Sequence, residues 1–121
     1  MKTMTVKEFH DALNNQGVPR EHLAFKCPMC GTIQSAADLV AAGAGKNFPD
    51  VAGYLGFSCV GRFTGAGQPR KKHDGKPCNW SLGGFLKCHR LEVIDDDGTH
   101  VPHFEPASKD EAVNHMLRKS E

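Results

Sequence analysis

The residues best suited to chemistry in this 121-residue chain are its five cysteines. Cys27 and Cys30 are separated by Pro28 and Met29 and are followed directly by Gly31. This spacing is typical of a rubredoxin-like knuckle, in which a tight turn directs two sulfurs at one point. The glycine takes a positive φ that a residue with a Cβ would resist. The pair therefore predicts half of a structural zinc site.

The other half must come from elsewhere, because structural zinc takes four Cys or His ligands and the chain has no second CxxC motif. Cys59 and Cys78 lie in or beside expected apolar strands and flank a long basic segment. We therefore predict a structural Zn²⁺ held by the thiolates of Cys27, Cys30, Cys59 and Cys78. Cys88, His73 and His89 remain alternatives for one ligand. Neighbouring strand residues point to opposite faces, so Cys88 and His89 cannot both face the site.

Other interpretations of these cysteines are open. Single cysteines are often small buried apolar residues. A redox pair would place Cys27 at the start of a helix, whereas Gly31 and a short strand follow the motif here. A zinc deaminase needs a proline before the first cysteine and a His-x-Glu motif, and Lys26 stands before Cys27. Four thiolates close the coordination shell of zinc, so we expect a protein that is not an enzyme.

Apolar runs such as residues 39–42 are far too short to cross a bilayer, and no apolar stretch follows residues 1–4. We therefore expect a cytoplasmic protein with no membrane partner, in which cysteines stay reduced.

Charge is distributed unevenly along the chain. Residues 60–90 carry seven Lys or Arg against one Asp, whereas residues 91–121 carry three against eight acidic residues. The segment 64–77 is rich in Gly, Pro and Lys and predicts a long surface loop. We predict that a partner binds to the basic residues Arg62, Arg70, Lys71, Lys72 and Lys76. If that partner is a nucleic acid, Trp80 or Phe63 could stack on its bases.

The order of expected elements indicates an α+β fold in a single zinc-stabilised domain spanning residues 1–121. Ser or Thr followed three residues later by Glu or Asp predicts helix starts at 5–8, 35–38 and 108–111, and residues 49–55 predict a further helix. Strands are expected at 22–26, 32–34, 56–61, 78–82, 85–87, 91–94 and 99–104. They would form a small antiparallel sheet with helices at both ends of the chain. Pro102 places the last strand at an edge.

Further motifs do not complete a site. Residues 43–46 lack the first glycine and the final Ser or Thr of a phosphate-binding loop. Residues 95–98 are too short for a calcium loop and predict a hairpin turn. His100 and His103 are expected at the surface, and they could serve a metal-dependent nuclease.

The segments 26–31, 56–62 and 75–84 resemble a family of short zinc-knuckle proteins from bacteriophages and prophages. The resemblance implies a mobile-element protein in a bacterial cytoplasm and carries over no catalytic residue. The expected function is binding to a host protein or nucleoprotein complex, as an inhibitor of a bacterial defence system such as CRISPR. The alternatives are nucleic-acid binding through residues 62–76 and metal-dependent nuclease activity.

Overall fold

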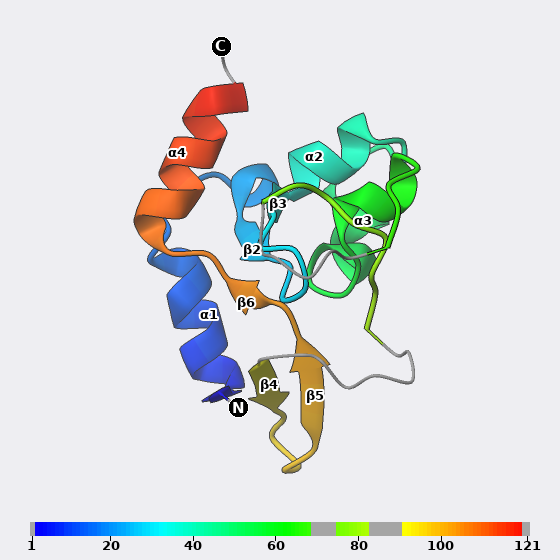
Figure 1. Cartoon of the computed structure of the whole chain (residues 1–121). Coiled ribbons are helices and arrows are strands. Elements are labelled where there is room, and N and C mark those ends of the chain that lie inside the picture. Colours follow the sequence, from blue (N-terminus) through cyan, green and yellow to red (C-terminus); the bar gives the residue numbers. More distant parts are fainter. Residues whose placement is uncertain (1, 69–74, 83–90, 120–121) are drawn as a thin grey trace.

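The computed structural model describes residues 2–68, 75–82 and 91–119 (Figure 1). Within these ranges the helices are α1 (Val6–Asn14), α2 (Ala36–Ala41), α3 (Phe48–Leu55) and α4 (Lys109–Lys119), with 3₁₀ turns η1 (Arg20–His22) and η2 (Val60–Phe63). The strands are β1 (Lys2–Thr5), β2 (Ala24–Lys26), β3 (Ile33–Ser35), β4 (Leu91–Ile94), β5 (His100–His103) and β6 (Glu105–Pro106). None of the helices in these ranges has the length and apolar character that crossing a membrane would require.

The helix starts lie where the sequence predicts them. Before α1, Thr5 Oγ1 accepts from the Glu8 amide at 3.1 Å, and the Glu8 carboxylate accepts from the Thr5 amide at 3.0 Å. Ser108 and Glu111 make the same reciprocal pair before α4, at 3.2 and 3.0 Å. These bonds satisfy amides that the first turn of a helix leaves unpaired.

The strands form two small sheets instead of the single antiparallel sheet that was predicted. One sheet has the order β1-β4-β5 and the other β3-β2-β6. The pair β1 and β4 is parallel. The sequence does not predict β1, because residues 2–5 show no apolar alternation, and in the structure residues 2, 3 and 5 are exposed. The edge position of β5, which contains Pro102, is confirmed.

The prediction of strands at 56–61 and 78–82 is wrong, because neither segment forms a strand in the structure. Their strand pairing is limited to a bridge between Ser58 and Ser81, and the chain then turns into η2. A Cβ at Gly61 would lie 2.5 Å from the carbonyl oxygen of Cys78, so only glycine allows the two segments to approach this closely. At η2 the backbones of the two segments are therefore in close contact. The strand predicted at 85–87 lies outside the described residues.

The buried amide side chain of Gln16 joins elements that are far apart in the sequence. Gln16, which is fully buried after α1, donates to the carbonyls of Ala24 and Ala107 at 2.9 and 3.0 Å. Its own oxygen accepts from the Ala24 amide at 2.9 Å. The side chain thereby links the end of α1 to β2 and to the chain just before α4.

Candidate metal centre

Cys27 and Cys30 lie at the tip of the hairpin formed by β2 and β3, as predicted. The Cys27 amide donates to the carbonyl of Thr32 at 3.0 Å, and the Gly31 amide donates to the carbonyl of Cys27 at 2.9 Å. Gly31 has a φ of 78°, in the region that favours glycine. The tight turn therefore brings both cysteines to one side of the hairpin tip.

Cys59 is positioned by a buried side chain that our sequence reasoning missed. Gln34 in β3 donates to the carbonyls of Leu55 and Ser58 at 2.9 and 2.8 Å, and accepts from the Val60 amide at 2.7 Å. All three partners lie close to Cys59 in the sequence. Gln34 thus fixes the Cys59 segment against the strand that leaves the knuckle. Only its place four residues after Cys30 could have drawn attention to it.

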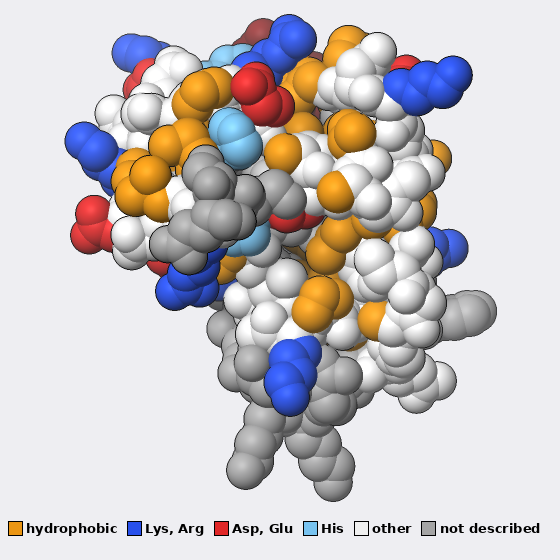
Figure 2. Space-filling view, turned by 90° about the horizontal axis from the view of Figure 1, so that it is seen from above, with side chains coloured by type: hydrophobic (Ala, Val, Ile, Leu, Met, Phe, Trp, Pro, Cys, Tyr) orange, Lys and Arg blue, Asp and Glu red, His pale blue; other side chains and the backbone are white. Residues whose placement is uncertain are grey.

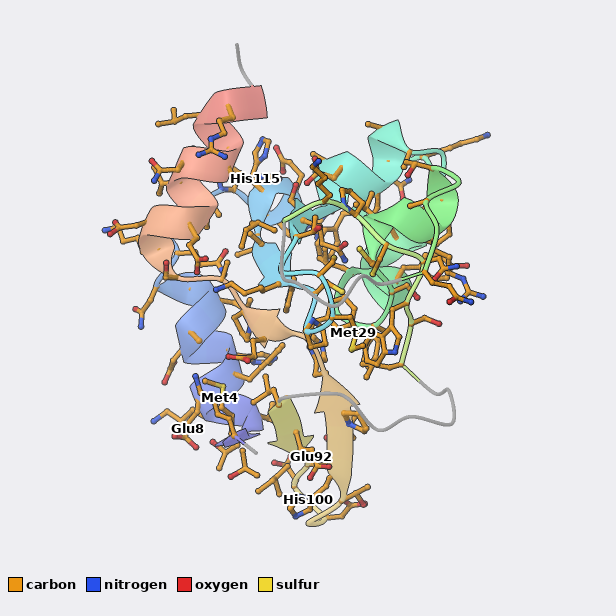
Figure 3. The ribbon with its side chains drawn as sticks, viewed as in Figure 1. Met4, Glu8, Met29, Glu92, His100 and His115 are labelled. Carbon is orange, nitrogen blue, oxygen red and sulfur yellow. The ribbon has the colours of Figure 1, made fainter. Side chains whose placement is uncertain are left out.

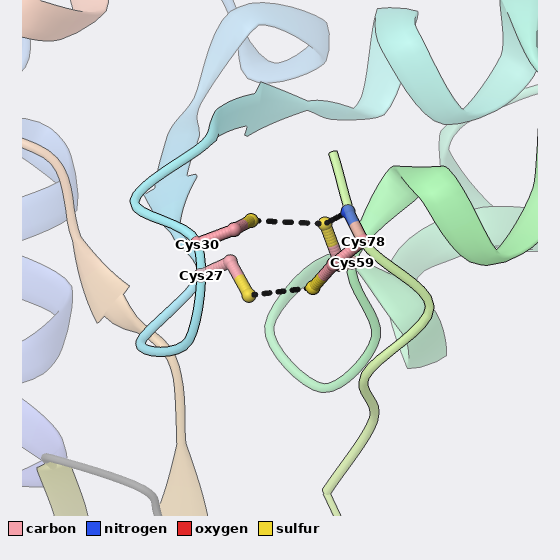
Figure 4. A group of neighbouring side chains, drawn as sticks. All are labelled: Cys27, Cys30, Cys59 and Cys78. Carbon is pink, nitrogen blue, oxygen red and sulfur yellow. Dashed lines mark hydrogen bonds between the residues drawn. The ribbon is translucent and has the colours of Figure 1, made fainter. Parts of the chain in front are cut away.

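The segment that contains Cys78 is held by hydrogen bonds from its amides to both other segments. Its amide donates to Cys59 Sγ at 3.4 Å, and the Gly75 amide donates to the carbonyl of Cys30 at 2.9 Å. Figure 4 shows the four side chains converging from three separate stretches of chain.

The four sulfurs are spaced for one tetrahedral ion. They all lie within 4.8 Å of one another, and all four cysteines are fully buried. The distances are 3.8 Å for Cys27 to Cys78 and 3.7 Å for Cys30 to Cys59. A regular tetrahedron with metal–sulfur bonds of about 2.3 Å has edges of about 3.8 Å. A disulfide would require about 2.05 Å, and the four thiols are free.

The thiols influence one another strongly. Hydrogen bonds from Cys27, Cys59 and Thr32 hold the pKa of Cys30 well below its usual range. Hydrogen bonds to Cys30 and Cys59, together with burial, raise the pKa of Cys27. Burial raises the pKa of Cys78 to about 12. One thiolate is therefore favoured at the cost of its neighbours, and a divalent cation would remove this conflict by compensating several thiolates at once.

The donor set fits zinc. Four thiolates in a tetrahedron are typical of Zn²⁺ or of iron–sulfur centres, and they leave no open coordination position. The cysteines that would hold the ion are those that the sequence predicts. When bound, zinc supplies structural cross-linking and no reactive water. The alternative ligands Cys88, His73 and His89 lie outside the described residues.

The structure describes only two of the five residues that we predict to bind a partner. Arg62 and Lys76 are exposed, whereas Arg70, Lys71 and Lys72 lie outside the described residues. Arg62 donates to the Ser81 hydroxyl at 2.7 Å. On the face shown in Figure 2, the described Lys and Arg side chains are scattered and form no continuous patch.

The two histidines considered for nuclease chemistry have different surroundings. His100 lies 3.0 Å from the Glu92 carboxylate near the tip of the β4–β5 hairpin, at the opposite end of the molecule from His115 (Figure 3). His103 is half-buried among aromatic rings, so its predicted surface position is wrong. Within the described residues, the four cysteines are the only group arranged to hold a metal.

Comparison with known proteins identifies the family of this chain. The family model described as VVA0879-like matches residues 5–107. This chain belongs to that family. The match spans all four clustered cysteines and ends before α4. We found no matching curated protein and no matching solved structure.

Proposed function

We propose that this VVA0879-like chain is a non-enzymatic, zinc-stabilised binding protein whose partner is a host protein or nucleoprotein complex. The observation that carries the proposal is the convergence of four buried sulfurs at tetrahedral spacing. A closed site of this kind stabilises a fold and leaves no position for a substrate. The function then lies on the surface that the ion organises.

That surface is the basic segment 64–77. Cys59 and Cys78 lie on either side of it, so a shared ion holds the chain where it approaches and leaves the segment. The amide of Asn79 donates to the carbonyl of Gly67 at 3.0 Å, which closes the base of the segment. A segment closed at its base loses less conformational entropy on binding than a free one.

We further propose that the protein is a phage or prophage accessory protein that acts against a bacterial defence system such as CRISPR. The support is the sequence resemblance of residues 26–31, 56–62 and 75–84. The basic charge of residues 60–90 suits an acidic protein face or a nucleoprotein.

The test is affinity purification from bacterial lysate followed by mass spectrometry. The variant reverses the charge of Arg70, Lys71 and Lys72. Its control reverses the exposed lysines Lys2, Lys7 and Lys46, which lie outside the basic segment. We expect the first variant to lose the partners that the control retains, with equal zinc content in both.

The same partners with both variants would exclude the basic segment as the contact. If capture disappears after nuclease treatment and the affinity falls steeply with salt, the alternative of direct nucleic-acid binding replaces the proposal. Nuclease activity that is abolished by alanine at His100 would instead support the enzyme alternative.

A further inference from the structure

A hollow lies away from the metal centre, between α1, α3 and the hairpin of β4 and β5. Its volume is about 330 Å³. Apolar side chains form most of its lining, among them Phe9, Phe25, Leu55 and Val93. A mostly apolar hollow of this size, with few polar groups, is at the small end of the range for ligand sites.

His103 supplies a polar atom in this apolar wall. Its ring centroid lies 4.5 Å from that of Phe9, 5.3 Å from Phe25 and 4.6 Å from Phe57. Its Nδ1 lies 2.8 Å from the carbonyl oxygen of Phe104. A carbonyl only accepts, so Nδ1 carries the proton and donates. In the neutral ring, Nε2 is then a hydrogen-bond acceptor.

That acceptor has no partner among the described residues. The ring lies directly over Gly56, where a Cβ would stand 2.4 Å from Nε2. Gly56 and His103 both line the hollow. Because Gly56 has no side chain, the His103 imidazole can lie against it and form part of the wall of the hollow.

We propose that this hollow binds a small planar apolar molecule of one or two rings that carries one hydrogen-bond donor, and that the donor pairs with His103 Nε2. The aromatic walls favour a flat ring through edge and stacking contacts. A wholly apolar ligand that covered Nε2 would leave this acceptor without a hydrogen bond, so the site selects for a ligand that brings a hydroxyl or N–H group. This site is independent of the basic segment and of the partner proposed above.

The probes are indole and N-methylindole, which share two fused rings and differ in the N–H donor. Binding to the full chain is followed by two-dimensional NMR of the isotopically labelled protein. We expect indole to shift the amide resonances of Ala52, Gly56 and His103, and to bind about fivefold to tenfold more tightly than N-methylindole. Equal affinities would refute the role of Nε2, and no shifts with either probe would refute the site.

Two variants separate the acceptor from the cavity. His103→Phe keeps an aromatic ring and removes Nε2, so it should make the two probes bind equally. Ala52→Phe places a ring at the exposed rim of the hollow and should abolish the binding of both probes. Its control is the neighbouring Gly53→Ala, since a Cβ at Gly53 meets nothing within 4 Å. Unchanged indole binding in folded Ala52→Phe would overturn the proposal.

Discussion

The region around the metal centre and the region around the β1-β4-β5 sheet are held together in different ways. The first relies on polar groups that are fully buried, namely four thiols and the amide of Gln34. Its strands β2 and β3 have only three residues each. The second relies on apolar contacts, with Leu91 fully buried and Val93 buried on the same strand, β4. In the first region, the free energy of metal binding would add to the stability of these short elements, because in such a site it is also free energy of folding.

This contrast predicts that the two regions respond to different perturbations. Losing one thiol should remove the metal and the structure that depends on it. Losing apolar volume in the sheet should lower the free energy of unfolding and leave the metal bound.

The largest effect is expected from Cys30→Ser. The serine cannot replace the thiolate, and metal-binding free energy is folding free energy in such a site. We expect zinc content and soluble yield to fall together, measured by elemental analysis and by circular dichroism of the purified chain. A folded, metal-free Cys30→Ser protein with native stability would contradict the account.

Leu91→Ala should destabilise the sheet region without releasing the metal. Leu91 is the first residue of β4, and its side chain is fully buried. Removing its side chain should lower the free energy of unfolding by about 2–5 kcal/mol. Denaturant titration gives this value, and elemental analysis should still find one metal per chain. Loss of metal from folded Leu91→Ala would show that the two regions are not separable in this way.

Gly56→Ala should perturb the aromatic cluster. The φ of Gly56 is −105°, so the backbone accepts an alanine, but its Cβ would lie 1.9 Å from the His103 ring. The ring must move, and we expect a loss of about 1–3 kcal/mol in the free energy of unfolding. Gly53→Ala, inside α3, meets open space and should be stabilising by up to about 1 kcal/mol. Equal effects of the two substitutions would mean that His103 does not occupy the space beside Gly56.

The smallest effect is a pH dependence from His103. Burial lowers the pKa of His103 below its usual 6.5, opposed in part by the hydrogen bond to Phe104. The unfolded chain therefore takes up this proton first, and stability should fall as the pH drops below about 6.5. Thermal unfolding between pH 7.5 and 5.5 should show a steeper loss for the native chain than for His103→Phe. Parallel curves would exclude a buried neutral His103.

Local signals in the sequence predicted much of the metal centre. The CxxC spacing and Gly31 were sufficient for the knuckle, and the positions of Cys59 and Cys78 around the basic segment were sufficient for their convergence. Helix starts were equally local, because a capping pair spans only four residues. Gln34 was missed because its three hydrogen bonds reach residues 21 to 26 positions away.

The sheets were predicted less well because strand pairing depends on distant partners. Residues 2–5 show no apolar alternation, yet they pair in parallel with β4, about 90 residues along the chain. Residues 56–61 have the composition of a strand, but they form a single bridge at Ser58 and then enter η2, where Gly61 packs closely on Cys78. The position of His103 likewise depended on the absence of a side chain at Gly56, far away in the sequence.

The central claim is that one ion joins three distant stretches of chain through four sulfurs. X-ray absorption spectroscopy of the purified, folded chain at the metal edge tests it most directly. The account predicts one metal per chain with four sulfur neighbours at about 2.3 Å. A folded chain that contains no metal, or a spectrum with nitrogen or oxygen in place of one sulfur, would contradict it.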